Sequence, residues 1–250
     1  MANQAQLLLL EKGFEVWNAW RKEHPNPPDL SEANLSKTNL AHFNLAGANL
    51  TRADLSLANL YQANLAGADL TRANVIGGLL TGASLQQVSL IGANLIGTKF
   101  MAANLQEARF QGAKMTRADL CEANLIGVDL SQVDCTEILG IGVNLKTANL
   151  TGTNLQGANL ERADLRGVNA SAANFSNVNL IETFLAHANF TGALLQQAVL
   201  QRARLRKTIF QGADLTQANL EKTTPSLCNF DGANMTGVLL PAQPILKAIA

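Results

Sequence analysis

The sequence predicts an all-β solenoid with an α-helical cap at its N-terminal end. Three observations lead to this prediction. The first two are a five-residue repeat that keeps one phase from Leu30 to Leu240 and a helical stripe of apolar residues before it. A third is the composition, which is 47% apolar but only 5% aromatic. The predicted core is therefore aliphatic, and the repeat decides the architecture because it covers most of the chain.

The repeat is defined by its centre position, which falls on every fifth residue from 30 to 240. Of these 43 positions, 39 carry Leu, Phe, Met or Val. A small residue, usually Ala, stands two positions earlier, and Asn or Asp stands between, as in Ala48-Asn49-Leu50. The exceptions at the centre position are Cys135, Gly140, Ala170 and Pro225.

Three of these exceptions are accompanied by a compensating change. Val133, Ile138 and Val168 stand where most repeats have Ala, two residues before Cys135, Gly140 and Ala170 respectively. Because interiors are close-packed, we expect the larger neighbour to replace the missing volume.

A period of five does not suit a helix, because 100° per residue would spread the repeat around the whole circumference. If three residues of each repeat are extended and the others turn a corner, alternation along the strand places the centre residue and the preceding Ala on one side. Asn or Asp then points outward, as does the residue after the centre. Glycines such as Gly67 and Gly92 are expected at corners.

This A-(D/N)-L-x-x pattern resembles the pentapeptide-repeat family over roughly residues 28–240. The resemblance implies a right-handed quadrilateral parallel β-helix with four pentapeptides in each coil. Residues 20 apart would then stack in columns spaced by about 4.8 Å. One column would end in an aromatic stack of Phe190, Phe210 and Phe230.

Residues 1–28 are predicted to form a helical cap and a Pro-rich joint. Leu7, Leu10, Phe14 and Trp17 follow helical spacing over residues 4–23, and three prolines between 25 and 28 end the helix. A cap is expected because the end of a repeat array must be covered. The functional alternative is a helix that binds a membrane surface or a partner.

Residues 29–240 form the predicted β-helix, and residues 241–250 form a C-terminal tail or cap. Some members of the family dimerise through their C-terminal coils. A simple cap and a monomer are favoured here, and a C-terminal homodimer is the alternative.

The charge balance disfavours nucleic acid as a partner. The chain has 19 basic and 19 acidic residues, which fits neither a basic face for duplex DNA nor an acidic surface that imitates DNA. No apolar stretch approaches the ~20 residues of a membrane span, and residues 1–10 show no secretory signal. A cytoplasmic location is expected.

No catalytic or metal constellation is found in the sequence, so an enzyme is not expected and no cofactor or metal is predicted. The three histidines and three cysteines are scattered. The many Asn and Asp residues suggest calcium, but side-chain bonds to the local backbone at corners explain them better.

An outer strip of apolar residues is the first candidate site. Outward positions are usually polar, and several here are not. The strip comprises Tyr61, Leu79, Met101, Cys121, Leu139 and Ile141, with Ile76, Ile91 and Ile96 on neighbouring faces. Contiguous apolar surface marks interaction sites. The alternative is relaxed surface composition without a function.

A basic corner is the second candidate site. It comprises Arg202, Arg204, Arg206 and Lys207. Such a cluster suits a phosphate or an acidic partner, and the alternative is an ordinary solvated face.

Three functions follow from these observations. The leading hypothesis is a non-catalytic scaffold that binds another protein through an outer face, since many family members lack an assigned biochemical role. The stretch from Trp17 to Arg21 with the following Pro-rich joint is similar to members from oxygenic photosynthetic bacteria. The first alternative is inhibition or protection of DNA gyrase by DNA mimicry, known for one acidic branch of the family, from which this chain departs in charge. The second is a structural spacer that assembles end to end.

Overall fold

The computed structural model of this 250-residue chain describes residues 2–241. In that part, two helices, α1 (Gln4–Leu10) and α2 (Phe14–Glu23), precede a series of single-residue parallel β-bridges that runs from Asp29 to Leu239. The chain divides into two compact units, Met1–Asn124 and Leu125–Ala250. Both units are built of the same coil.

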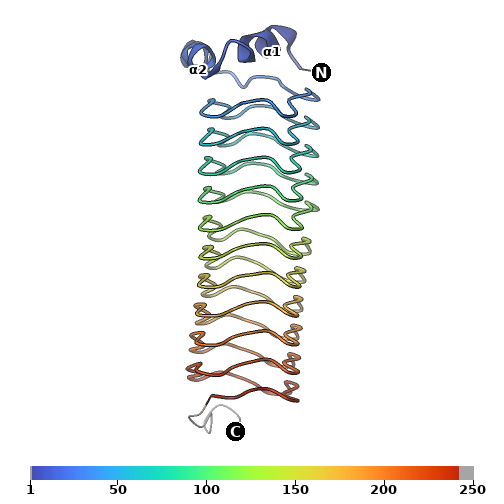
Figure 1. Cartoon of the computed structure of the whole chain (residues 1–250), viewed down its shortest axis with the longest axis vertical. Helices are drawn as coiled ribbons and strands as arrows, with labels where there is room; N and C mark the ends of the chain where they lie inside the picture. The colour runs from blue at the N-terminus through green and yellow to red at the C-terminus, as the bar shows by residue number, and fades with distance from the viewer. Residues whose placement is uncertain (1, 242–250) are drawn as a thin grey trace. The chain divides into compact units, whose positions relative to one another are not determined.

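Each coil contains four repeats, because every bridge joins residues 20 apart. Asn49 pairs with Asp69 in the first unit, and Asp129 pairs with Asn149 in the second. Figure 1 shows successive coils stacked within each unit. The outward residue turns both backbone groups to the preceding coil: Asp69 N–H donates to Ala48 C=O at 2.9 Å, and its C=O accepts from Leu50 N–H at 2.7 Å.

The core is the predicted aliphatic one. Centre residues such as Leu50 and the Ala residues before them are buried. At the irregular repeats, Val133, Ile138 and Val168 are buried as expected. A Cβ at Gly140 would lie 2.9 Å from Leu160 Cδ2, so neighbouring side chains already occupy the space that Gly140 leaves.

The aromatic column in the second unit is also confirmed. Phe190, Phe210 and Phe230 stack in sequence, with ring centroids 5.5 and 5.1 Å apart and nearly parallel planes. Phe175 packs edge-on against Phe190 at 5.1 Å.

Corners require a left-handed backbone at the second residue after each centre. Gly67 adopts φ 67° there, in agreement with the prediction for glycine. The same position also accepts side chains, for example Arg52 at φ 56° and Ala102 at φ 55°. This conformation costs about 1–2 kcal/mol for residues other than glycine, so the coil as a whole must hold it in place.

Pro225 interrupts the pairing but not the phase. Among the described residues, Thr224 forms no bridge with Arg204, although the preceding columns are paired. Pairing resumes directly afterwards, where Lys207 N–H donates to Ser226 C=O at 2.7 Å and Phe210 N–H donates to Asn229 C=O.

The N-terminal cap is confirmed, but it consists of two helices rather than the one continuous helix that the stripe predicted. Gly13 separates them at φ 92°, a conformation outside the helical region. The spacing of four between Leu10 and Phe14 fits an uninterrupted helix. The pattern of apolar residues therefore gave no indication of the break at Gly13. Trp17 is buried, whereas Phe14 remains 40% exposed.

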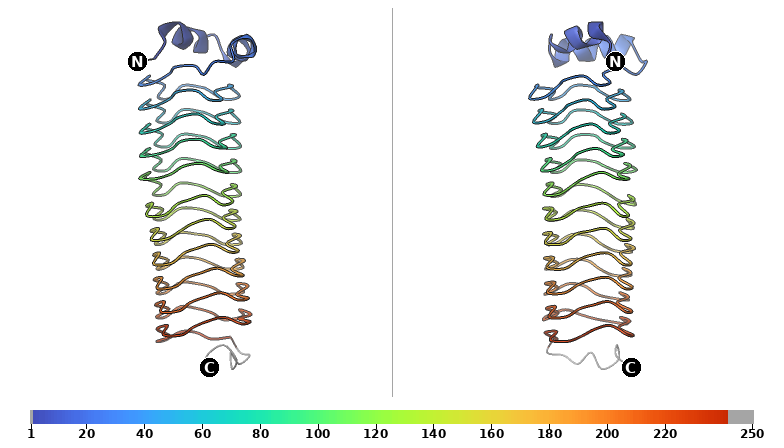
Figure 2. Two further views of the ribbon diagram at one scale, coloured as in Figure 1. Left: turned by 180° about the vertical axis from the view of Figure 1, so that it is seen from behind. Right: turned by 90° about the vertical axis from the view of Figure 1, so that its right-hand side faces the viewer.

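Side chains of α2 satisfy the exposed backbone of the first coil. Trp17 Nε1 donates to Asn44 C=O at 2.9 Å, and Asn18 accepts from Asn44 N–H at 2.7 Å through Oδ1. The Arg21 guanidinium donates to Ala46 C=O at 2.9 Å. Figures 1 and 2 show both helices over the open end of this coil. The cap thus covers part of an unpaired edge.

The predicted C-terminal tail or cap, residues 241–250, lies outside the described residues except for Pro241. In the described part of the chain, no helix has the length and apolar character needed to cross a membrane.

Candidate functional site

Three residues of the predicted strip surround one depression in the first unit. Tyr61, Leu79 and Met101 are 41%, 44% and 42% exposed, which is high for large apolar side chains. They line an open depression of about 550 Å³. The other lining residues are Asn59, Thr81, Lys99 and Asp119. We call this surface the apolar patch.

The register of the coil explains why these side chains meet. Leu79 takes the outward strand position between Asn59 and Lys99, to both of which it is bridged. Tyr61 and Met101 occupy the turn residue that follows the same face two coils apart, with Thr81 between them. Polar residues are usual at these positions. The three apolar residues are exceptions, and together they give one face of the coil an apolar surface.

An ion pair borders the apolar patch. Lys99 Nζ lies 3.8 Å from Asp119 Oδ2, and the Asp119 side chain is only 10% exposed. Asp119 Oδ1 also accepts from Cys121 N–H at 3.1 Å. Cys121 itself is half-buried. Lys99 is therefore the more exposed member of this ion pair.

Aromatic contacts connect the apolar patch with the cap. The Tyr61 ring packs edge-on against His42 at 5.6 Å, and His42 contacts the Phe14 ring of α2 at 5.7 Å. Phe14 and Tyr61, at the two ends of this series, are both exposed. The patch thus has a neighbouring apolar surface on α2.

The remaining two strip residues belong to the second unit. Leu139 is 37% exposed and Ile141 is half-buried. They stand at the same repeat positions as Leu79 and Tyr61 respectively.

A second apolar corner in the first unit was only partly foreseen. Ile76 and Ile96 are exposed, as the sequence suggested, and Ile91 is half-buried. The most exposed apolar residue here is Leu57, at 56%, in a left-handed turn position. A Cβ at Gly77 would lie 2.7 Å from Leu57 Cδ2. Gly77 thus leaves room for the Leu57 side chain to lie over the next coil. The sequence signal for this exposed residue was a leucine at a turn position that Gly or a charged residue usually fills.

The four residues of the basic cluster do not share one corner. Arg202 lies in one turn, Arg204 on the following strand position, and Arg206 and Lys207 in the next turn. The Arg202 guanidinium is engaged with Glu182 at 3.2 Å. Residues 203–205 form the strand segment between the two turns, so the four residues lie at two turns of one coil rather than at the single corner that the sequence predicted.

An outward aromatic residue, Phe184, organises the cations on this face. The Arg204 guanidinium lies 4.6 Å from the centroid of the Phe184 ring, and that of Arg166 lies at 5.8 Å. Arg166 also forms an ion pair with Asp164. Burial raises the Asp164 carboxyl pKa, but the hydrogen bonds and charge of Arg166 outweigh burial, so this pKa lies below its ordinary value. Phe184 replaces the usual outward Asn, and this substitution was the missed sequence signal.

The outward Asn and Asp residues make the predicted bonds to local backbone. Asp54 Oδ1 accepts from Ser56 N–H at 3.0 Å, two residues on. Their side chains also form ladders between coils, as Asn59 Nδ2 does with Asn39 Oδ1 at 3.0 Å. Over residues 2–241, no group of three or more His, Cys, Asp or Glu residues is arranged to hold a metal ion.

Two of the three cysteines are poor nucleophiles. Burial raises the Cys135 thiol pKa to about 12, and it raises that of Cys228 to about 11. Both thiols are therefore protonated near neutral pH, whereas the thiolate is the reactive form.

The repeat matches a known family model over most of the chain. The model described as pentapeptide repeats matches in copies that together cover residues 29–134 and 144–240. The chain belongs to the pentapeptide-repeat family. Its fold is therefore the right-handed quadrilateral parallel β-helix, with α1 and α2 as an N-terminal cap.

Solved pentapeptide-repeat proteins are similar to this chain. HetL of the cyanobacterium Nostoc sp., described as involved in regulation of heterocyst differentiation, is 26% identical, with coverage of 87% of this chain and 91% of HetL and a TM-score of 0.36. QnrB1, a plasmid-mediated fluoroquinolone resistance protein, is 20% identical over 69% of this chain and 90% of QnrB1, with a TM-score of 0.44.

A third relative, from the thylakoid lumen of Arabidopsis thaliana, is 27% identical over 36% of this chain and 66% of that protein, with a TM-score of 0.31. Among curated proteins, no match was found.

Proposed function

We propose that this pentapeptide-repeat protein is a non-catalytic scaffold that binds a partner protein through the apolar patch. The observation that carries the proposal is the exposure of Tyr61, Leu79 and Met101 around one depression. Exposed contiguous apolar surface is characteristic of protein interaction sites. The repeat needs none of these residues for its own folding, since Asn and Thr fill the same positions in other coils.

The chemistry of the patch defines the kind of partner. A depression with apolar walls accepts a Leu, Phe or Met side chain, and burial of such a side chain contributes about 1.5–3 kcal/mol. Lys99 at the border favours an acidic residue beside that anchor, because the lysine is 47% exposed. We therefore infer a partner segment with one large apolar residue flanked by Asp or Glu. Leu139 and Ile141 are proposed to extend the contact.

The domain organisation follows from the same proposal. Residues 1–28 act as the cap and joint, residues 29–240 as the β-helical scaffold, and residues 241–250 as a tail or cap. The basic residues Arg204, Arg206 and Lys207 provide a secondary surface for an acidic partner. A cytoplasmic location remains the expectation from the sequence.

Charge argues against DNA mimicry as the function. Several acidic side chains pair with cations, as Glu182 does with Arg162 and Arg202, each at 3.2 Å. Net charge is zero, whereas imitation of DNA requires an extended negative surface. We expect no inhibition or protection of gyrase in a supercoiling assay, and either effect at micromolar protein would revive this alternative.

The scaffold function is tested by capture of partners from a lysate of the source organism. The wild type is compared with Met101→Asp, and Gln111→Asp serves as the matched control because it adds the same charge at an exposed turn residue on another face. A protein retained by the wild type and by Gln111→Asp, but lost by Met101→Asp, supports the proposal when the purified pair rebinds. Equal retention by all three proteins excludes the apolar patch.

A further inference from the structure

The second unit carries three neighbouring cations without an acidic partner. Arg204, Arg206 and Lys207 are exposed, and none of them forms an ion pair in the described part of the chain. The acidic side chains of the adjacent corner are already engaged: Glu182 contacts two arginines, and Glu221 accepts a hydrogen bond from a glutamine at 3.1 Å. The net charge of the whole chain is zero, so this positive surplus is local.

The repeat register shows which group is missing. Asp164, Phe184 and Arg204 occupy the same outward position in successive coils and are joined by bridges. Arg166 follows Asp164 by two residues and is neutralised by it: Nε donates to Oδ1 at 2.8 Å, and Nη2 donates to Oδ2. Two coils later, Arg206 stands in the place of Arg166. The position that holds a carboxylate in one coil therefore holds a second guanidinium in the other.

Phe184 holds the Arg204 side chain in place. The guanidinium lies 4.6 Å from the centroid of the half-buried Phe184 ring. A cation is attracted to the face of an aromatic ring, so the long Arg204 side chain has less freedom to lose when it binds a ligand. Because the guanidinium occupies the ring, Phe184 does not offer the free stacking surface that a nucleic-acid base needs. The planar fork of Arg204 instead suits a carboxylate.

The spacing of the two arginines defines the ligand further. Arg204 and Arg206 are separated by one residue, Leu205, which is buried. In an extended chain, side chains two residues apart point to the same side, about 6.6 Å from one another. Two acidic residues with the same separation can therefore each face one guanidinium. Lys207 adds a third positive charge beside them.

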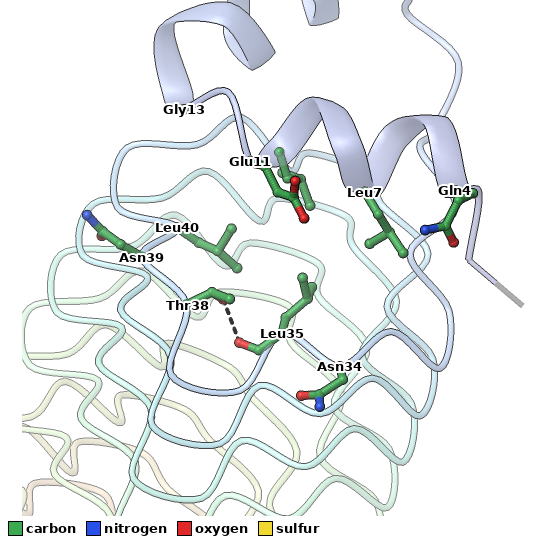
Figure 3. A pocket seen from close by; sticks show the side chains of 10 residues that line it. Gln4, Leu7, Glu11, Gly13, Asn34, Leu35, Thr38, Asn39 and Leu40 are labelled. Atoms are coloured by element: carbon green, nitrogen blue, oxygen red, sulfur yellow. Dashed lines mark hydrogen bonds between the residues drawn. The ribbon is translucent and has the colours of Figure 1, made fainter.

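Acidic surface elsewhere disfavours binding of such a ligand at the cap. Glu11 lines the pocket between α1 and the first coil, together with Leu7 and Leu10. Figure 3 shows the Glu11 side chain pointing from α1 toward the coil. An acidic segment is repelled there by like charge, whereas the surplus in the second unit attracts it.

We propose that Arg204, Arg206 and Lys207 bind a protein segment in which two Asp or Glu residues are separated by one residue. Each carboxylate pairs with one guanidinium, as in the aspartate–arginine pair two coils before. Phe184 acts as a positioning residue for Arg204. The proposal rests on the secondary basic surface of the proposed function and names its ligand. The site shares no residue with the apolar patch.

Peptide titration of the isotope-labelled full chain, followed by NMR, tests the site. The probe is acetyl-Gly-Glu-Ala-Glu-Gly-amide, and the matched peptide acetyl-Gly-Ala-Glu-Glu-Gly-amide has adjacent glutamates. At about 50 mM salt, where surface charges are weakly screened, we expect the spaced peptide to shift arginine Nε–H signals with a Kd of about 1 mM. The adjacent pair should bind at least about threefold more weakly, because alternate side chains of an extended chain point to opposite sides. Equal affinities, or no shift at about 10 mM peptide, overturn the proposal.

Charge removal locates the contact. Arg204→Gln and Arg206→Gln should each weaken peptide binding by about threefold to fivefold, the range expected of an exposed ion pair. Arg72→Gln is the matched control, because it removes the same charge from an exposed turn of the first unit. Equal affinity of all three variants contradicts the site. Pentathymidylate should bind more weakly than the spaced peptide, and tighter binding that Arg204→Gln abolishes would make nucleic acid the ligand and overturn the proposal.

Two further comparisons separate the parts of the proposal. Phe184→Leu should weaken peptide binding by about twofold to fivefold, whereas Phe184→Tyr, which keeps the ring, should bind as the wild type does. Equal affinity of these two variants contradicts the positioning role. Met101→Asp alters only the apolar patch and should leave peptide binding unchanged. Failure of partner capture at the patch is therefore distinguishable from failure of this site, and a loss of peptide binding in Met101→Asp contradicts their separation.

Discussion

The indole Nε1 of Trp17 donates a 2.9 Å hydrogen bond to the backbone C=O of Asn44. The indole is fully buried, and it joins α2 to an edge of the first coil that would otherwise be unpaired. The contact explains why two short helices can cap this face. The side chains of Trp17 and Asn18 replace the hydrogen bonds that a preceding coil would have made to Asn44.

Trp17→Phe keeps a buried aromatic ring, although a smaller one, and removes this donor. We expect the free energy of unfolding to fall by about 1–3 kcal/mol, because a buried C=O is left without a partner. Urea denaturation followed by circular dichroism measures the change. Trp20→Phe is the control, since Trp20 packs on His24 and Trp17 and its indole makes no hydrogen bond to the coil within residues 2–241. Equal losses from both variants would show that packing alone holds the cap.

The stack of Phe190, Phe210 and Phe230 should stabilise the second unit beyond the burial of its rings. Phe210→Leu is compared with Phe110→Leu, because both rings are fully buried and Phe110 contacts no other aromatic ring among the described residues. We expect Phe210→Leu to lower the unfolding free energy by about 0.5–1.5 kcal/mol more than Phe110→Leu. Equal effects would mean that ring stacking contributes nothing there.

Ala102→Gly should stabilise the protein. Ala102 adopts φ 55°, which glycine tolerates without strain. The relief of about 1–2 kcal/mol is offset in part by the greater freedom of glycine in the unfolded chain, so we expect a net gain of about 0.5–1 kcal/mol in urea denaturation. Ala103→Gly at the adjacent buried position should destabilise instead. A loss of stability in Ala102→Gly would refute this account of the corners.

Acid should destabilise the coils through their outward aspartates. The Asp54 carboxyl pKa lies below its ordinary value of 3.8, first because Ser56 N–H and then because its hydroxyl bonds to the carboxylate, and desolvation opposes the shift. A lowered native pKa gives stability that is present above the unfolded pKa and is lost as pH falls through the native one. The loss should therefore begin below about pH 4.

Asp54→Asn retains an accepting Oδ1 but cannot titrate. The urea midpoint of this variant should depend less on pH between about 4 and 2 than that of the wild type. Parallel pH profiles would show that this carboxylate does not contribute to the acid sensitivity. The effect is expected to be modest, because Asp54 is only half-buried and solvent screens its carboxylate.

The sequence predicted the coil well because each repeat reports the same physical constraint. The burial of Leu50 and of Ile138 and the aromatic column at Phe210 all follow from one phase and a stacking distance of 20 residues. The helix break at Gly13 was missed, because the spacing of Leu10 and Phe14 suits a continuous helix.

The candidate site was only partly predictable, because side-chain pairing depends on geometry that a repeat pattern does not contain. The positions of Tyr61, Leu79 and Met101 follow from the register. The packing of the Arg166 and Arg204 guanidinium groups against the Phe184 ring does not, because it depends on the conformations of three side chains.

A return to the usual repeat residue provides the most direct test of the scaffold function. Leu79→Asn restores the common outward residue, and its amide can join the ladder that Asn59 makes with Asn39. The measurement is isothermal titration of the captured partner into wild type and Leu79→Asn, with denaturation to confirm equal folding. We predict unchanged or greater stability and at least about tenfold weaker binding, since the lost burial is worth roughly 1.5–3 kcal/mol. Equal affinity for both proteins would contradict the proposed role of the apolar patch.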